Sequence, residues 1–269
     1  MSDVDRIAHG LLQALDRAAL LPLPTQTEPG FDLAQAFAVA DRLRSLRIQR
    51  GERTAGYKIG FTNRTLWPRY GVAAPIWAPV WRHTVTMLDG CDATLFLGGL
   101  AQPRIEPEIV FGLRSPPAPG MDNAALVGCI EWVAHGFEIV QTHYADWVFQ
   151  LPDCFVDGAL HGRLFIGPKL AIDRFDDAAA ELRALELTLT CDGRVVDRGV
   201  GRNVLDGPVD ALRQWVDAMH AQAQHWPIAA GDVVTTGTIT DAWPIAPGQR
   251  WSSALTDPRL PGLTLATVG

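Results

Sequence analysis

The sequence predicts an α+β protein in which a helical N-terminal region precedes a mixed, coiled β-sheet. Three observations lead to this fold class. Apolar residues recur at helical spacing over 3–20 and 32–49. Short extended runs broken by Gly and Pro follow Gly51. These runs do not alternate with helices in the rhythm of a parallel βαβ sheet. We therefore divide the chain into a helical N-terminal region, 1–52, and a β-rich domain, 53–269.

The individual elements follow from local patterns. Ile7, Leu11 and Leu15 form the apolar stripe of the first helix, and a Pro-rich linker over 22–30 separates it from the second. Two later helices are expected over 122–134 and over 208–224, the latter with Pro208 in its first turn. Asp192-Gly193 is typical of a hairpin turn. The extended runs predict strands at 55–60, 83–88, 105–113, 136–141, 162–167, 185–191, 194–198, 232–236 and 262–268.

Composition excludes several classes of protein. With 48% hydrophobic and 20% charged residues, the 269-residue chain can bury a large core and does not resemble a disordered segment. A net charge of −7 without a Lys/Arg run argues against nucleic acid and membrane partners. The first residues show no signal-peptide pattern, and no apolar run reaches 18 residues. The four cysteines are scattered and form no C-x-x-C pair, so we expect reduced thiols in a cytoplasmic protein.

Two glutamates stand in an otherwise apolar run, R-I-E-P-E-I-V-F over 104–111. In a strand, Glu106 and Glu108 would project to the same side, where two carboxylates repel unless a cation lies between them. Pro107 cannot donate to a ladder, which predicts an edge or a bulge. Glu138, in G-F-E-I-V, is a third acid in an apolar run. Oxygen-only ligation suits Mg²⁺ or Mn²⁺. The alternative is an edge strand whose charges face water.

Two further motifs carry polar groups near strand ends. Lys58 lies in G-Y-K-I-G-F-T-N and either reaches the surface or places an ammonium beside a substrate. Gly237 and Thr238 lie in D-V-V-T-T-G-T, which either marks a turn or offers hydroxyl and N–H groups to a small anion.

These motifs and their order resemble those of the fumarylacetoacetate hydrolase superfamily, in the branch of 2-keto-4-pentenoate hydratases and 4-oxalocrotonate decarboxylases. The matching stretches are G-Y-K-I-G-F-T-N, P-R-I-E-P-E-I-V-F, G-F-E-I-V, D-W-V-F-Q-L-P-D, G-V-G-R-N-V-L-D-G-P and A-G-D-V-V-T-T-G-T. They span nearly the whole chain.

The resemblance implies a mixed β-roll core, which would make 53–269 the catalytic domain, and a homo-oligomer. It also implies Mg²⁺ or Mn²⁺ on Glu106, Glu108 and Glu138, Lys58 beside a 2-oxo acid substrate, and Gly237 and Thr238 at the substrate's carboxylate. A divalent cation there would stabilise negative charge on the C2 oxygen of such an acid.

The chain departs from the family pattern near this site. Gln141-Thr142-His143 stands where the family often has D-S-R, and 157–160 reads D-G-A-L instead of D-N-A-S. His143 and His161 are candidate replacements for the missing polar groups. Other departures are Ile76, in place of an acid found in some hydratases, Trp67, in place of a glutamine, and two further aromatic gains, Trp77 and Trp81.

We therefore expect a metal-dependent hydratase of a 2-hydroxy-2,4-dienoate or a related 2-oxo acid. The first alternative is a decarboxylase of a vinylogous 2-oxo acid, for which Arg64 and Arg69 are candidate partners of the distal carboxylate. The second is a binding or scaffold subunit that keeps the fold and the metal without turnover.

Overall fold

Two curled β-sheets and a group of N-terminal helices make up the computed structural model, which describes residues 2–64, 67–70, 75–222 and 225–269. The larger sheet is mixed: seven of its strands run in the order β2-β1-β11-β5-β6-β7-β3, with β1–β11 and β3–β7 parallel, while β12 pairs with β5 and β8 with β6. The smaller sheet has the order β10-β9-β13-β14-β4. The predicted α+β fold with a mixed, coiled sheet is confirmed.

The strands have the following bounds: β1 Thr54–Gly60, β2 Ile76–Trp81, β3 Val85–Met87, β4 Asp92–Phe96, β5 Arg104–Leu113, β6 Ile130–Val140, β7 His161–Ile166, β8 Leu170–Ala171, β9 Glu186–Cys191, β10 Arg194–Val200, β11 Val233–Thr238, β12 Trp243–Pro244, β13 Arg250–Leu255 and β14 Thr264–Val268. The α-helices are α1 Asp3–Arg17, α2 Pro24–Thr27, α3 Leu33–Gln49, α4 Trp67–Tyr70, α5 Asn123–Cys129, α6 Leu151–Val156, α7 Ala178–Ala184 and α8 Pro208–His220.

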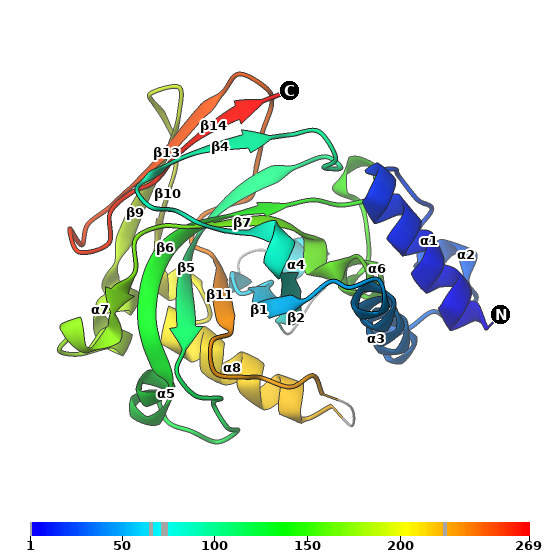
Figure 1. Ribbon diagram of the computed structural model, residues 1–269, viewed down its shortest axis with the longest axis horizontal. Coiled ribbons are helices and arrows are strands. Elements are labelled where there is room, and N and C mark those ends of the chain that lie inside the picture. Colours follow the sequence, from blue (N-terminus) through cyan, green and yellow to red (C-terminus); the bar gives the residue numbers. More distant parts are fainter. Residues whose placement is uncertain (1, 65–66, 71–74, 223–224) are drawn as a thin grey trace.

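The N-terminal helices begin and end where local chemistry dictates. Ser2 caps α1 by accepting from the N–H of Asp5, and Asp32 caps α3 by accepting from Gln35. Helix α1 ends at Arg17, earlier than predicted, because Ala18 is left-handed, with a φ of 49°. Figure 1 shows α1, α2 and α3 grouped at one end of the molecule beside α6. Their apolar faces close that end of the sheet.

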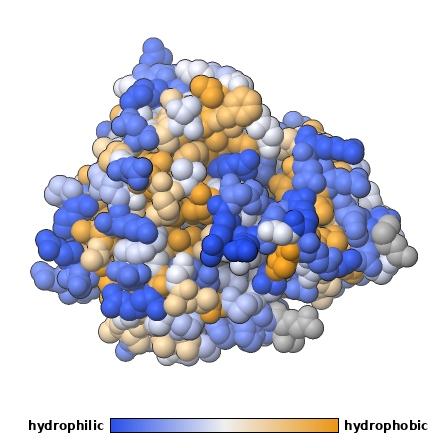
Figure 2. All heavy atoms as spheres, viewed as in Figure 1, coloured by the Kyte–Doolittle hydropathy of each residue, from blue (hydrophilic) through white to orange (hydrophobic). Residues whose placement is uncertain are grey.

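The second sheet contains the predicted hairpin. Strands β9 and β10 pair antiparallel, and the linking residues Asp192 and Gly193 both have positive φ, as a tight hairpin turn of this type requires. Strand β4 is at one end of this sheet, where Phe96 lies next to Val268 of β14 and both are exposed. Figure 2 shows apolar side chains among polar ones over the upper part of this face, where Figure 1 places β4 and β14.

Strands β5 and β6 form the centre of the larger sheet. They pair antiparallel along most of their length, and β5 lies between β6 and β11. The prediction that Pro107 marks a sheet edge is therefore wrong, but the alternative of a bulge is correct. The register of β11 against β5 shifts between Thr235 and Thr238, and the carbonyl of Pro107 accepts from the N–H of Ile239. The irregularity lies opposite Ile109, two residues from Pro107.

Several predicted elements need correction. The helix expected over 122–134 ends at Cys129, and Trp132 and Val133 belong to β6, because a short apolar run has no periodicity that separates a buried strand from a helix. The Pro-rich linker contains α2, and the strand expected over 83–88 starts with a 3₁₀ turn, Arg82–Thr84. Helix α8 ends at His220, and residues 223–224 of the predicted helix lie outside the described residues. Strands β2, β4, β8, β12 and β13 and helices α4, α6 and α7 were not predicted.

Within the described residues, no helix combines the length and the apolar character needed to cross a lipid bilayer.

A substitution at Gly56 tests the pairing of β1 with β11. Its φ is +144°, and a Cβ atom there would lie 1.9 Å from the carbonyl oxygen of Val233 on β11. We expect Gly56→Ala to lower the free energy of unfolding by about 2–4 kcal/mol, because the strand pair must separate and the backbone becomes strained. Urea unfolding followed by circular dichroism measures this.

Gly10→Ala is the matched control. Gly10 lies within α1, and no atom would come within 4 Å of an added Cβ. This substitution is expected to raise the free energy of unfolding by roughly 0.5–1 kcal/mol through helix propensity. Equal effects of the two substitutions would contradict the close approach of β1 to β11.

Candidate active site

Three glutamates meet on the two central strands. Glu106 of β5 and Glu138 of β6 are direct cross-strand partners, and Glu108 lies two residues further along β5, opposite Thr238 of β11. One carboxylate oxygen from each glutamate lies within 4.8 Å of the other two. Glu108 and Glu138 are fully buried, whereas Glu106 is half-buried. The strand pairing therefore brings together the three acids that the sequence singled out.

Lys58 balances part of this negative charge. Its Nζ lies 3.1 Å from Oε2 of Glu138, and its side chain is only 3% exposed. Burial opposes a charged lysine, but the three glutamates outweigh it and raise the pKa of Lys58 above its ordinary value. Burial likewise opposes a charged Glu138, yet Lys58 and a hydrogen bond from His161 lower its pKa to about 2. Lys58 and Glu138 thus form a buried ion pair.

The charges of the other two carboxylates are compensated only in part by the described residues. Burial, with the charge of Glu138, raises the pKa of Glu106 to about 7, although Lys58 acts in the opposite direction. Burial and the two neighbouring carboxylates raise the pKa of Glu108 well above its ordinary value. Oε1 of Glu108 is buried and has no hydrogen-bond partner among the described residues. Oxygen donors at this spacing whose charge is only partly compensated fit a hard divalent cation such as Mg²⁺ or Mn²⁺.

His161 and Thr84 fix the orientation of Glu138. Nδ1 of His161 lies 2.7 Å from Oε1 of Glu138, and Nε2 lies 2.8 Å from Oγ1 of Thr84. The Thr84 hydroxyl is also 2.8 Å from the carbonyl oxygen of Trp81. Glu138 is therefore held from two sides, by an ammonium and by an imidazole that is itself anchored.

The turn at Gly237 supports Glu108. The N–H of Gly237 donates to Oε2 of Glu108 at 2.9 Å. Gly237 has a φ of +97°, and an added Cβ would lie 1.8 Å from Oγ1 of Thr62, so only glycine fits here. This N–H is engaged by Glu108 and is not free for a substrate carboxylate. Thr238, by contrast, lines the adjoining pocket.

An open pocket adjoins the cluster and contains Lys58 and Glu106 in its wall; its empty space, with the open solvent at its mouth included, is about 540 Å³. Lys58 is the one positively charged side chain among the described residues that line it. The Thr62 hydroxyl is buried there without a hydrogen-bond partner in the described part of the chain. Most other lining residues are apolar or aromatic, including Ile76, Phe61, Val140, Trp147, Phe149 and Leu160.

The three tryptophans at which the sequence departs from the family pattern, Trp67, Trp77 and Trp81, do not line this pocket. Trp77 and Trp81 are buried and do not line this pocket, and Trp77 packs against Phe37 and Phe155. Trp67 also lies outside the pocket lining, where its Nε1–H donates to the carbonyl of Phe61. The pocket's aromatic wall is instead formed by residues that the sequence did not single out, Phe61, Trp147 and Phe149.

The polar residues that the sequence suggested as further site residues were two histidines and two arginines, and the structure gives them different surroundings. His161 contacts Glu138, but His143 pairs with Asp157, and neither histidine lines the pocket with Lys58. Arg64 is exposed and pairs with Asp206 at 2.7 Å. The Arg69 side chain lies outside the described part of the chain.

Sequence reasoning missed Thr62 and Thr84. Thr62 was visible in G-F-T-N, four residues after Lys58, whereas Thr84 carries no local signal, because only the fold brings it to His161.

Proteins of known activity are similar to this chain along nearly its full length. It is 31% identical to a 2-keto-4-pentenoate hydratase of Paraburkholderia phymatum over 89% of both chains. It is 29% identical to a 2-hydroxyhexa-2,4-dienoate hydratase of Comamonas testosteroni over 95% of this chain and 96% of that one. It is 30% identical to a 4-oxalocrotonate decarboxylase of a Pseudomonas species over 91% of both. No family model matches the chain.

Solved structures show the same fold. The 4-oxalocrotonate decarboxylase of Pseudomonas putida G7, complexed with magnesium and adipate, superposes with a TM-score of 0.89 at 24% identity, covering 98% of this chain and 97% of that one. A fumarylpyruvate hydrolase of Pseudomonas aeruginosa, in complex with Mn²⁺ and pyruvate, has a TM-score of 0.56 at 14% identity, covering 80% and 89%. The predicted β-roll with N-terminal helices is thereby confirmed.

The role of Lys58 in balancing the cluster can be measured without any ligand. We expect Lys58→Met, in the presence of EDTA, to lower the free energy of unfolding by about 3–5 kcal/mol, because Glu138 loses its buried counter-charge. Urea unfolding at neutral pH measures the loss.

The chain contains one other lysine, Lys169, which is exposed and lies over the ring of Trp132. Lys169→Met is therefore the matched control, with an expected change of no more than about 1 kcal/mol. If Lys58→Met were equally mild, the ammonium would not compensate the carboxylates.

Proposed function

We infer the function from one premise: this chain belongs to the hydratase and decarboxylase branch of the fumarylacetoacetate hydrolase superfamily, and the hydratases and decarboxylases similar to it are lyases. We propose that it is a divalent-metal-dependent hydratase that adds water to a 2-hydroxy-2,4-dienoate or a related 2-oxo acid in the catabolism of aromatic compounds. The observation that carries the proposal is the buried carboxylate cluster beside Lys58, at the wall of an open pocket.

Glu106, Glu108 and Glu138 would hold the cation, Mg²⁺ or Mn²⁺. The solved relatives contain such ions, and the unpartnered Oε1 of Glu108 offers a donor atom here. When bound, the cation supplies positive charge that stabilises negative charge on the carboxylate and C2 oxygen of a 2-oxo acid. Lys58 and His161 hold Glu138 in place, and Gly237 holds Glu108, so the donor set is pre-arranged.

Lys58 and Thr62 are the groups of this chain best placed to act on the substrate. Lys58 is charged, so its Nζ can donate to oxygen that gains negative charge when a dienol substrate converts to its 2-oxo form. In that conversion the proton of the 2-hydroxyl is lost and another is added to the far end of the diene. Water then adds across the conjugated double bond to give a 4-hydroxy-2-oxo acid. The unpartnered hydroxyl of Thr62 is available to orient that water.

The pocket wall favours the hydratase over the decarboxylase. A decarboxylase substrate of this type carries a second carboxylate at its distal end, which needs a cation of its own. Arg64 is engaged by Asp206, and the described lining of the pocket beyond Lys58 is mostly apolar and aromatic. Such a wall matches an uncharged distal end, such as a vinyl or alkyl group.

We further propose that the protein forms a homo-oligomer. Phe96 is 62% exposed on the end strand of the smaller sheet, beside Val268, which is 42% exposed. An exposed apolar pair at a strand edge supports contact with a second copy.

The carboxylate assignment is tested by direct metal binding. We expect Glu108→Gln to weaken Mn²⁺ binding, measured by electron paramagnetic resonance of free Mn²⁺, by about 100-fold or more, because one of three anionic donors is lost. Glu131→Gln is the control, since Glu131 is exposed on the same strand as Glu138. Unchanged Mn²⁺ affinity in Glu108→Gln would rule out this site.

The reaction is tested by incubating the protein and Mg²⁺ with 2-hydroxydienoates and with 4-oxalocrotonate, while following ultraviolet absorbance and CO₂ release. We expect the absorbance of the dienoates to fall without CO₂, and Lys58→Met to lower kcat by about 100-fold or more. CO₂ release from the diacid would establish the decarboxylase instead. Metal binding without turnover would leave the scaffold alternative.

A further inference from the structure

A second cavity lies between the N-terminal helices and the β-roll. Its empty space, with the open solvent at its mouth included, is about 560 Å³, and it shares no lining residue with the pocket that contains Lys58. Its apolar walls come from α1, α3 and β2 and include Leu11, Leu15, Leu43, Trp81 and Trp226. His161 also lines this cavity, so a single side chain joins it to Glu138.

Arg44 contributes a positive charge to this cavity without an acidic partner. Its Nε is buried and makes no hydrogen bond, and its guanidinium forms no ion pair with the described residues. Its guanidinium lies over the ring of Trp226, with Cζ 5.9 Å from the ring centroid. An unsatisfied buried donor destabilises the protein, and an anionic ligand would remove that cost.

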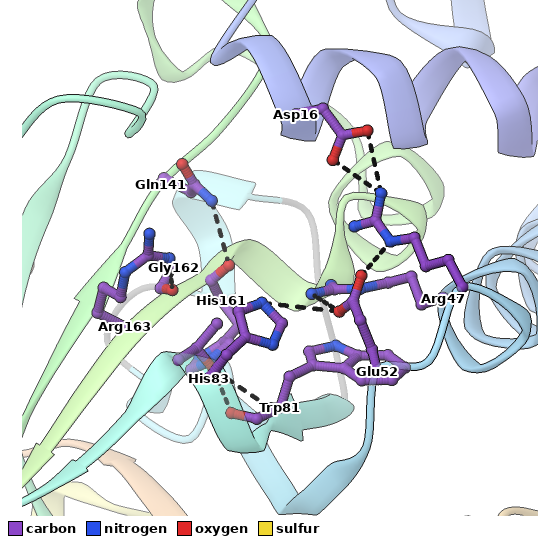
Figure 3. Close-up of polar contacts among 11 residues, drawn as sticks. Asp16, Arg47, Glu52, Trp81, His83, Gln141, His161, Gly162 and Arg163 are labelled. Atoms are coloured by element: carbon purple, nitrogen blue, oxygen red, sulfur yellow. Dashed lines mark hydrogen bonds and ion pairs between the residues drawn. The ribbon is translucent and has the colours of Figure 1, made fainter.

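Arg47, one turn further along α3, also lines the cavity, but its guanidinium has an acidic partner. Its Nη2 lies 2.7 Å from Oε2 of Glu52, and its guanidinium lies 4.1 Å from the centroid of the Trp81 ring. Figure 3 shows Glu52 directed at Arg47, with His83 on its other side. The charge of Arg47 is therefore neutralised within the protein, and that of Arg44 is not.

His143 supplies a second unpartnered polar atom to the same cavity. Its Nδ1 lies 2.6 Å from Oδ1 of Asp157, and Oδ2 of that carboxylate accepts from the His143 N–H and from Thr142. With Nδ1 fixed in this way, Nε2 is the ring atom left for a ligand, and it is buried without a partner among the described residues. His143 is only 2% exposed, so bulk water does not satisfy it.

We propose that this cavity is a binding site for an aromatic carboxylic acid, separate from the carboxylate cluster. The acid's carboxylate would bind Arg44, and its apolar body would lie among the leucines and the two tryptophan rings. The polar atom facing His143 Nε2 would be a ligand oxygen. This assignment rests on the cavity's own residues and does not depend on the proposed reaction.

Isothermal titration calorimetry of the full chain with Mg²⁺ tests the proposal, with 4-phenylbutyrate as the probe. We expect saturable binding at one site per chain, at least about tenfold weaker for the uncharged 4-phenylbutanamide. Arg44→Gln should weaken 4-phenylbutyrate at least about tenfold. Arg42→Gln is the control on the same helix, because Arg42 pairs with Asp5 and does not line the cavity. It should leave the affinity within about twofold.

Three results would overturn the site. They are the absence of saturable binding, equal affinity for the acid and the amide, and binding that is unchanged in Arg44→Gln. Binding that survives Arg44→Gln but is abolished by EDTA would place the probe at the carboxylate cluster instead. Leu15→Trp, which fills the cavity from α1, should also abolish binding, while circular dichroism confirms that each variant is folded.

Discussion

The cross-strand pairing of Glu106 with Glu138 is the constraint on which the rest of the site depends. Antiparallel pairing brings the half-buried carboxylate of Glu106 next to the fully buried carboxylate of Glu138, where the two charges repel and are screened only in part by water. The ammonium of Lys58 pairs with Glu138. The pKa values of Glu106 and Glu108 remain raised. A protein that only needed stability would place apolar residues here. Retaining three acids makes sense if a cation completes the charge balance.

The order of the strands explains how distant segments reach this point. Five neighbouring strands, β1, β11, β5, β6 and β7, each supply one part of the cluster. They supply Lys58, Gly237, the Glu106 and Glu108 pair, Glu138 and His161 respectively. The bulge in β11 opposite Ile109 belongs to the same arrangement, because it accompanies the turn that directs the Gly237 N–H at Glu108. Sheet irregularity and charge placement are therefore parts of one local structure.

Sequence reasoning reached the fold class and the carboxylate cluster because both depend on local patterns. Period-two alternation placed Glu106 and Glu108 on one side of a strand, and the motif order carried the family resemblance. Sequence reasoning failed where tertiary contacts determine the secondary structure of a segment or the partner of a side chain. The segment 130–134 reads equally well as helix or strand, and only its pairing with β5 and β8 makes it part of β6. Pro107 indicated an edge because nothing local reveals β11 beside it. His143 and His161 looked equivalent, although one contacts Glu138 and the other Asp157.

The two histidines show how the departures from the family pattern are distributed. His161 stands behind Glu138, anchored by Thr84, and supports the cluster without entering the pocket of Lys58. His143 is turned toward a different cavity, with Asp157 fixing its ring. The altered segments 141–143 and 157–160 therefore do not rebuild polar groups around the pocket of Lys58. They meet at the wall between the carboxylate cluster and the helix-covered cavity, where His161 contacts both. A change in that cavity has a direct physical route to the orientation of Glu138.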